Sequence, residues 1–246
     1  MKKKSFIKKA LLWSAVVLLL LIIAFGIYVS DYYHADEMAI QAFSASENVV
    51  QTSLEDGSIV FSSSNPSSGM IFYPGGKVEH TAYIPLMRAL AEKGVLCILV
   101  KMPFRLAVFD IHAAKGIQEA YPDITEWYIG GHSLGGTMAG YYLEDHFSEF
   151  EALILLGSYT TVDLSKTNLR MLSLYGSNDK VLDRNKYEEN KKNLPSDLTE
   201  VVLEGGCHAY FGMYGSQKGD GTPTISNTEQ IRLSATHIFN FIQKGK

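Results

Sequence analysis

The sequence Gly-His-Ser-Leu-Gly at residues 131–135 constrains the fold of this chain more than any other feature. It follows residues 127–129, a short run typical of a β-strand, and it precedes residues 136–143, which are typical of a helix. A strand that turns directly into a helix leaves no room for bulky side chains beside the serine, and the serine hydroxyl then projects from the end of the strand. Because such short motifs arise by chance, the strand–turn–helix context carries the prediction.

Strand-like and helix-like runs alternate after the first 45 residues. We expect strands over residues 49–52, 58–61, 70–73, 95–100, 127–129, 152–156, 170–175 and 199–203. We expect helices over residues 81–93, 107–120, 136–143, 184–193 and 228–243. Two leading strands followed by this alternation are typical of an α/β domain whose mostly parallel central sheet has helices on both faces. The short, strongly apolar strands agree, since such a sheet is buried on both sides.

Residues 10–29 are nearly all apolar and carry no charge. As a helix this segment is about 30 Å long, enough to cross the hydrocarbon core of a bilayer. Five lysines precede it, so the positive-inside rule predicts a cytoplasmic basic tail over residues 1–9 and places the rest of the chain outside. We therefore expect one transmembrane signal anchor over 10–29, a stalk over 30–45 and a folded domain over 46–246. A cleaved signal peptide is the competing interpretation, although no Ala-x-Ala cleavage site follows the long apolar run.

The charge of the chain also differs on the two sides of residue 29. The first 29 residues carry five lysines and no acid, so the remainder holds 17 basic and 26 acidic residues, a net charge of −9. An acidic domain disfavours nucleic acid and anionic lipid surfaces as partners. The two cysteines, Cys97 and Cys207, lack the spacing of a metal site. Cys97 lies in an apolar strand and is expected to be buried, with a Cys97–Cys207 disulfide as the alternative.

A serine hydroxyl needs a base to take its proton, and the base needs a carboxylate that orients it. We expect His208 to be the base, because it follows the last predicted strand, and Asp179 to be the orienting acid, because it follows the strand before. Asp163 is the alternative acid, and Asp183 is expected to cap the helix that follows it. The other downstream histidines, His146 and His237, lie at the end of one predicted helix and inside another.

The developing oxyanion of an acyl transfer needs two backbone N–H donors. One is expected from Leu134, directly after Ser133, and the other from Gly75 or Gly76, in the loop after the strand at 70–73. Two glycines there allow the backbone to approach a substrate oxygen closely, whereas the alternative is an ordinary Pro-Gly turn.

These segments together resemble the α/β-hydrolase superfamily, and in particular its small esterase-like members related to dienelactone hydrolases. The resemblance covers about 200 residues and rests on four segments: 73–76, 131–136, 176–179 and 205–208. It implies an α/β-hydrolase fold with a Ser133–Asp179–His208 triad and no cofactor or metal. Dienelactone hydrolases carry a cysteine nucleophile, so Ser133 favours a general serine hydrolase. Many members insert a lid domain after the strand that here ends at residue 156, and residues 157–167 are too few for one.

The sequence therefore predicts a membrane-anchored, extracytoplasmic serine hydrolase that cleaves a carboxylic ester or related acyl bond of a small molecule. An acyltransferase with the same triad and a catalytically inactive binding module of this fold remain alternatives. A dinucleotide-binding protein is disfavoured, because no Gly-x-Gly-x-x-Gly follows the first strand. Neither the substrate nor the oligomeric state follows from the sequence.

Overall fold

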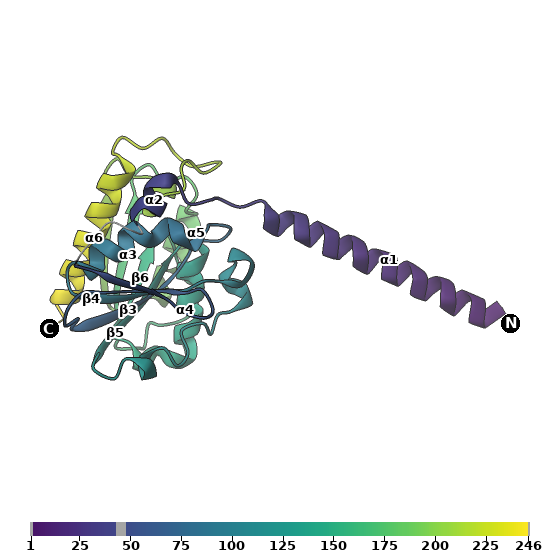
Figure 1. The fold of residues 1–246 in the computed structure, drawn as a ribbon, viewed down its shortest axis with the longest axis horizontal. Helices are drawn as coiled ribbons and strands as arrows, with labels where there is room; N and C mark the ends of the chain where they lie inside the picture. The colour runs from purple at the N-terminus through teal and green to yellow at the C-terminus, as the bar shows by residue number, and fades with distance from the viewer. Residues whose placement is uncertain (1, 43–47, 246) are drawn as a thin grey trace. The chain divides into compact units, whose positions relative to one another are not determined.

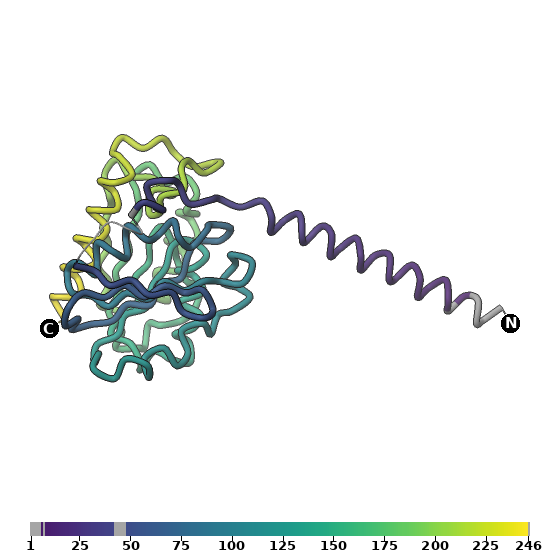
Figure 2. The backbone as a smooth tube through the Cα atoms, viewed as in Figure 1, coloured from purple at the N-terminus to yellow at the C-terminus, as the bar shows by residue number. Residues whose placement is uncertain are grey.

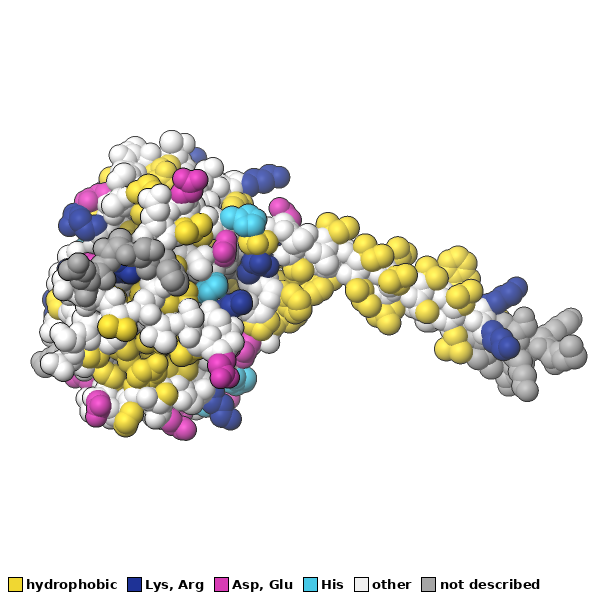
Figure 3. Space-filling model, viewed as in Figure 1, with side chains coloured by type: hydrophobic (Ala, Val, Ile, Leu, Met, Phe, Trp, Pro, Cys, Tyr) yellow, Lys and Arg dark blue, Asp and Glu magenta, His cyan; other side chains and the backbone are white. Residues whose placement is uncertain are grey.

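The computed structural model describes residues 2–42 and 48–245, and the chain divides into two units, Met1–Tyr32 and Tyr33–Lys246. The first unit is the helix α1 (Lys2–Ser30). An 18-residue window in its segment Lys8–Ser30 has a mean hydropathy of 2.8, and among the described helices this is the one long and apolar enough to cross a membrane. Hydrophobic side chains cover the helix and lysines lie near its N-terminal end (Figure 3). A signal sequence shares these properties.

Within the described part of the second unit, eight strands form one sheet in the order β1-β2-β4-β3-β5-β6-β7-β8. The strands β1 and β2 pair antiparallel with each other, and β2 pairs antiparallel with β4; all other pairs are parallel (Figure 1). The strands are β1 (Val50–Ser53), β2 (Ile59–Ser62), β3 (Ser68–Tyr73), β4 (Val95–Leu99), β5 (Glu126–His132), β6 (Ala152–Leu156), β7 (Arg170–Gly176) and β8 (Asp197–Leu203). The prediction of a mostly parallel sheet is confirmed.

Helices cover both faces of the sheet, as predicted. The helices of this unit are α2 (Glu37–Ala42), α3 (Ile84–Ala91), α4 (Leu134–His146), α5 (Arg184–Asn190) and α6 (Asn227–Gln243). On one face, α3 and α6 bury residues such as Leu86 and Ile238 against Met70 and Phe72 of β3. On the other face, α4 packs against the alternate residues of the same strands, such as Ile71. This alternation follows from the two-residue period of a strand.

The helix predicted over residues 107–120 is wrong. That segment contains only two short 3₁₀ turns, Ala107–Phe109 and Gln118–Ala120, joined by non-helical turns. The Tyr73 hydroxyl explains the difference, because it donates to the Ile111 carbonyl and accepts from the Ala114 N–H, both at 2.8 Å. A partner from β3 thus takes backbone groups that an α-helix would pair internally.

The structure also corrects the expected stalk. Residues 33–42 belong to the compact unit rather than to a linker: Ala39 of α2 is fully buried, and α2 lies against α3 (Figure 2). The domain start expected near Ser46 lies outside the described residues. Cys97 is buried as predicted, Cys207 is also buried, and both are free thiols, so the alternative disulfide is not formed. Burial raises the pKa of both thiols, that of Cys207 to about 12.

Candidate active site

Ser133 occupies the turn between β5 and α4. Its backbone has φ 51° and ψ −123°, a conformation that L-residues rarely adopt. A Cβ atom on Gly131 would lie 2.5 Å from the Tyr73 carbonyl oxygen, so the position before the turn accepts only glycine. Two hydrogen bonds hold the strained residue: the Ser133 N–H donates to the Leu156 carbonyl at 3.0 Å, and the Ser158 hydroxyl donates to the Ser133 carbonyl at 2.7 Å. The local structure is the strained turn that the sequence predicts.

Asp179 and His208 form a buried pair. Asp179 follows β7 and His208 follows β8, so neighbouring parallel strands deliver both to the same sheet edge. His208 Nδ1 lies 2.9 Å from Asp179 Oδ2, and each side chain is 1% exposed. The other carboxylate oxygen of Asp179 accepts the N–H groups of Val181 and Leu182 at 2.9 and 2.8 Å. These bonds fix the carboxylate and direct one oxygen at the imidazole.

His208 and Ser133 line the same cavity, of about 280 Å³, together with Leu134 and Gly157. His208 Nε2 is buried and has no hydrogen-bond partner among the described residues, so the Ser133 hydroxyl is not hydrogen-bonded to it. The structure thus brings Ser133 and the His208–Asp179 pair to one site.

The two glycines of the loop after β3 have different positions. The Gly75 N–H donates to the Tyr83 hydroxyl at 3.1 Å, so it is not available to a substrate oxygen. Gly76 lies beside the start of α4: a Cβ on Gly76 would lie 2.8 Å from Leu134 Cδ2. Within the described part of the chain, neither the Gly76 N–H nor the Leu134 N–H has an acceptor. Leu134 and Gly76 therefore fit an oxyanion hole, and Gly75 does not.

Tyr83 and His132 connect this loop to His208, and the sequence analysis did not single them out. The Tyr83 oxygen accepts from the Gly75 N–H, and it is hydrogen-bonded to His132 Nδ1 at 2.7 Å. The ring of His132 lies on that of His208, with 4.5 Å between the centroids. Burial, followed by the neighbouring His208 imidazole, holds the pKa of His132 well below its usual value. His132 is therefore neutral, and its role is structural.

Gly157 is a further residue that the sequence analysis missed. It follows β6 directly and has a φ of +51°. A Cβ there would lie 2.9 Å from His208 Nδ1 and 3.1 Å from Asp179 Oδ2. Only glycine satisfies both the backbone conformation and the close approach of the imidazole–carboxylate pair. The signal in the sequence was a glycine directly after the predicted strand at 152–156, at the sheet edge where the site was expected.

Two polar side chains hold the histidine loop from behind. Gln230 of α6 is fully buried, and its amide accepts from the Cys207 N–H at 2.9 Å and donates to the Cys207 carbonyl at 2.7 Å. Asp220 accepts the Ala209 N–H at 2.8 Å and the Lys180 N–H at 3.3 Å. Asp220 thus bridges the residue after His208 and the residue after Asp179.

The other sequence candidates are not paired with His208, although Asp183 lines the Ser133 cavity. Asp163, the alternative acid, is bonded to Ser165 within its own exposed loop. Asp183 caps α5 as predicted, through the Lys186 N–H at 3.0 Å. His146 pairs with Glu149, outside the cavity. Among the described residues, no group of three or more His, Cys, Asp or Glu side chains is arranged to hold a metal ion.

Comparison with known proteins agrees with this architecture. The model of the family described as "Alpha/beta hydrolase family" matches residues 69–232, which include the three residues of the site. The chain belongs to the alpha/beta hydrolase family. A comparison with curated protein sequences finds no match.

Several solved structures share the fold at low sequence identity. TT1662 from Thermus thermophilus is 14% identical, with a TM-score of 0.59 and coverage of 80% of this chain and 97% of that one. Est1E from Butyrivibrio proteoclasticus is 13% identical, with a TM-score of 0.55 and coverage of 80% and 98%. A dienelactone hydrolase from Anabaena variabilis is 13% identical, with a TM-score of 0.57 and coverage of 77% and 97%. At these identities the likeness shows the fold alone.

Proposed function

We propose that this alpha/beta hydrolase is a membrane-anchored, extracytoplasmic serine hydrolase that cleaves a carboxylic ester or related acyl bond. One observation carries the proposal: His208 is held by Asp179 at 2.9 Å through Nδ1, its Nε2 has no partner in the described chain, and His208 lines the same cavity as Ser133. A buried imidazole with one nitrogen fixed by a carboxylate and the other unpaired, beside a serine at the same cavity, suits a general base.

The proposed reaction has two halves. His208 Nε2 takes the proton of the Ser133 hydroxyl as its oxygen attacks the substrate carbonyl carbon, and the Leu134 and Gly76 N–H groups stabilise the oxyanion. The C–O bond of the ester then breaks, and the leaving alcohol receives the proton from His208. In the second half His208 takes a proton from water as the water oxygen attacks the acyl carbon. The bond from that carbon to the Ser133 oxygen then breaks, His208 returns the proton to this oxygen, and the acid leaves. Asp179 keeps the Nδ1–H tautomer and stabilises the imidazolium.

The proposed location rests on α1. Its apolar segment is long enough to span the bilayer, and lysines precede it, an arrangement that keeps the N-terminus in the cytoplasm. The hydrolase domain then lies outside the cytoplasmic membrane.

Labelling by a fluorophosphonate probe and turnover of 4-nitrophenyl acetate test the activity. Ser133→Ala is expected to abolish labelling and to lower turnover about 10⁴-fold or more, and His208→Gln is expected to do nearly the same. Ser216→Ala, at an exposed serine, is the matched control and should behave as wild type. Equal turnover in Ser133→Ala would reject the nucleophile, and a folded wild-type protein that takes no label would favour a binding module.

A further inference from the structure

The candidate membrane span ends very close to the hydrolase domain. The span ends at Ser30, and the compact unit begins at Tyr33. Three Cα–Cα steps reach at most about 11 Å. If α1 crosses the bilayer as proposed, Tyr33 is therefore held at the membrane surface, and whatever surrounds Tyr33 on the domain is held there too.

Tyr33 enters the domain at the loop that carries the proposed oxyanion donor. Its N–H donates to the Lys77 carbonyl at 2.8 Å, and its carbonyl accepts the Glu79 N–H at 2.9 Å. The N–H of Lys77 in turn donates to the Arg105 carbonyl at 2.8 Å. Two hydrogen bonds thus connect the membrane tether to residue 105, and Lys77 directly follows Gly76. The point where the chain enters the domain is thus hydrogen-bonded to the loop that carries the proposed oxyanion donor.

Large apolar side chains are exposed in the segment around residue 105. Phe104 is 52% exposed, Val108 46% and Phe109 51%, and the rings of Phe104 and Phe109 meet edge-on with 5.6 Å between centroids. The backbone here is strained, since Lys77, Phe104 and Arg105 have φ values of 59°, 53° and 60°. Non-glycine residues with such φ angles are costly and cluster at functional sites.

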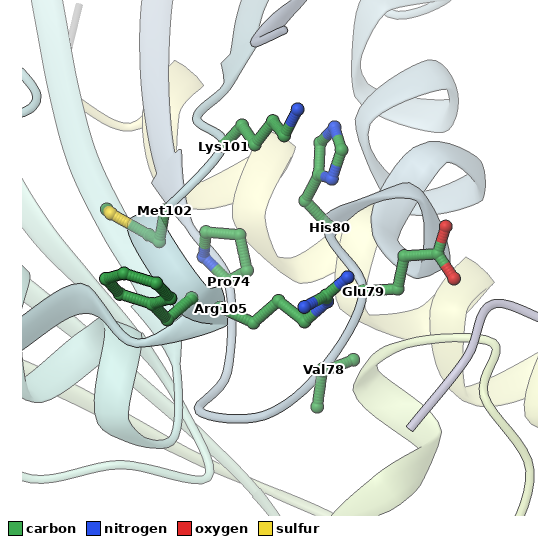
Figure 4. A pocket seen from close by; sticks show the side chains of 8 residues that line it. Pro74, Val78, Glu79, His80, Lys101, Met102 and Arg105 are labelled. Carbon is green, nitrogen blue, oxygen red and sulfur yellow. The ribbon is translucent and has the colours of Figure 1, made fainter. Parts of the chain in front are cut away.

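Basic side chains accompany the aromatic ones. A pocket of about 280 Å³ beside Phe104 is lined by Lys101, Arg105 and His80 (Figure 4). The acidic residue that lines this pocket, Glu79, accepts the Ala35 N–H at 3.1 Å, and its carboxylate points away from Lys101 in Figure 4. The other acidic residue nearby in the sequence is Asp110, which follows Phe109. Aromatic rings beside Lys and Arg are the side chains that proteins place at a bilayer interface. The net charge of −9 disfavours anionic lipid elsewhere on the domain, whereas this surface has its own cations.

We propose that the docking rim, formed by Lys101, Phe104, Arg105, Val108 and Phe109, contacts the lipid bilayer that α1 enters. The apolar side chains insert between headgroups, and the cations contact lipid phosphates. Resting on the proposed function, this inference also names the substrate class: an acyl ester presented by the membrane, which reaches the shallow cavity at Ser133 without crossing bulk water.

Lipid quenching of a site-specific fluorophore tests the docking directly. The full chain with Val108→Cys is labelled with bimane and reconstituted into vesicles of phosphatidylcholine, phosphatidylglycerol and doxyl-labelled lipid. Because Cys97 and Cys207 are buried, bimane reacts selectively with the new cysteine. Val202→Cys is the matched control: Val202 is 41% exposed and lies on β8, five strands from β4 in the sheet order, or about 24 Å from the strand that Lys101 follows. We expect at least threefold stronger quenching at residue 108. Equal quenching at the two positions overturns the proposal.

A second measurement compares substrates. Phe109→Ser is expected to lower the ratio of turnover on a vesicle-borne acyl ester to turnover on soluble 4-nitrophenyl acetate about tenfold, because half-exposed apolar area no longer inserts. Lys192→Gln, an exposed charge outside the rim, leaves the ratio as in wild type. An unchanged ratio in Phe109→Ser rejects the proposal. The quenching measurement does not depend on catalysis, so the two proposals can fail separately. If residue 108 is not quenched but Ser133→Ala abolishes the activity of the enzyme, the docking is rejected and the hydrolase stands. If residue 108 is quenched but the wild-type protein has no activity, the hydrolase is rejected and the docking stands.

Discussion

Gly157 offers a sharp test of whether the His208–Asp179 pair sets the reaction rate. In Gly157→Ala the new Cβ would lie 2.9 Å from His208 Nδ1 and 3.1 Å from Asp179 Oδ2, which lie only 2.9 Å apart. Normal contact between a carbon and a nitrogen needs several tenths of an ångström more, so the imidazole must move. A displacement of about 1 Å at a catalytic group costs about 10²-fold in rate. We therefore expect kcat to fall about 10²-fold.

The same substitution also strains the backbone, and a control separates the two effects. Gly116 has a φ of +76°, and a Cβ there would meet nothing within 4 Å. Both Gly116→Ala and Gly157→Ala should lose about 1–2 kcal/mol of stability through the left-handed backbone, but only Gly157→Ala should lose turnover. Turnover of 4-nitrophenyl acetate and thermal unfolding are measured for both. If Gly157→Ala folds and keeps kcat within threefold of wild type, the reasoning about the pair is refuted.

Three further outcomes follow from the surroundings of the site. Gln230→Met, similar in volume, leaves the Cys207 N–H and carbonyl unpaired and should cost about 2–4 kcal/mol in urea unfolding. Tyr83→Phe frees the Gly75 N–H and should lower kcat about tenfold at unchanged KM, since the oxyanion loop is less well fixed. The pKa of His132 in the folded chain lies below its ordinary 6.5, so the folded state binds fewer protons. Stability from this group is complete above pH 6.5 and is lost as the pH falls below it, by at most about 1.4 kcal/mol per pH unit; His132→Asn should flatten this slope in thermal unfolding.

The sheet follows from the sequence because local pattern and tertiary environment agree there. β6 is apolar at every position, β3 is apolar from Met70 to Tyr73, and both are fully buried, so short apolar runs predict them. The failure at residues 107–120 has the opposite cause. The Tyr73 hydroxyl, distant in sequence, takes the backbone groups of Ile111 and Ala114, and no helical propensity within the segment reveals that competitor.

The candidate triad was predictable for a topological reason. Ser133, Asp179 and His208 each follow a strand, and parallel strands end at the same sheet edge, so counting strands brings the three together. The sequence predicts that one of the two glycines after β3 supplies an oxyanion donor, but it does not show which one. The structure favours Gly76, because the Gly75 N–H donates to the Tyr83 hydroxyl.

The position of β8 explains why the histidine loop needs support from outside the sheet. β8 is the last strand in the order, so within residues 2–42 and 48–245 no further strand lies beyond it to hold the chain that follows. The missing hydrogen bonds come from elsewhere: Gln230 of α6 pairs with Cys207 as a neighbouring strand would, and Asp220 holds the peptide of Ala209. An imidazole on an unsupported edge loop would have no fixed distance to a serine on a central strand. The helix α6 and the loop before it therefore serve the geometry at His208, although neither lines the Ser133 cavity.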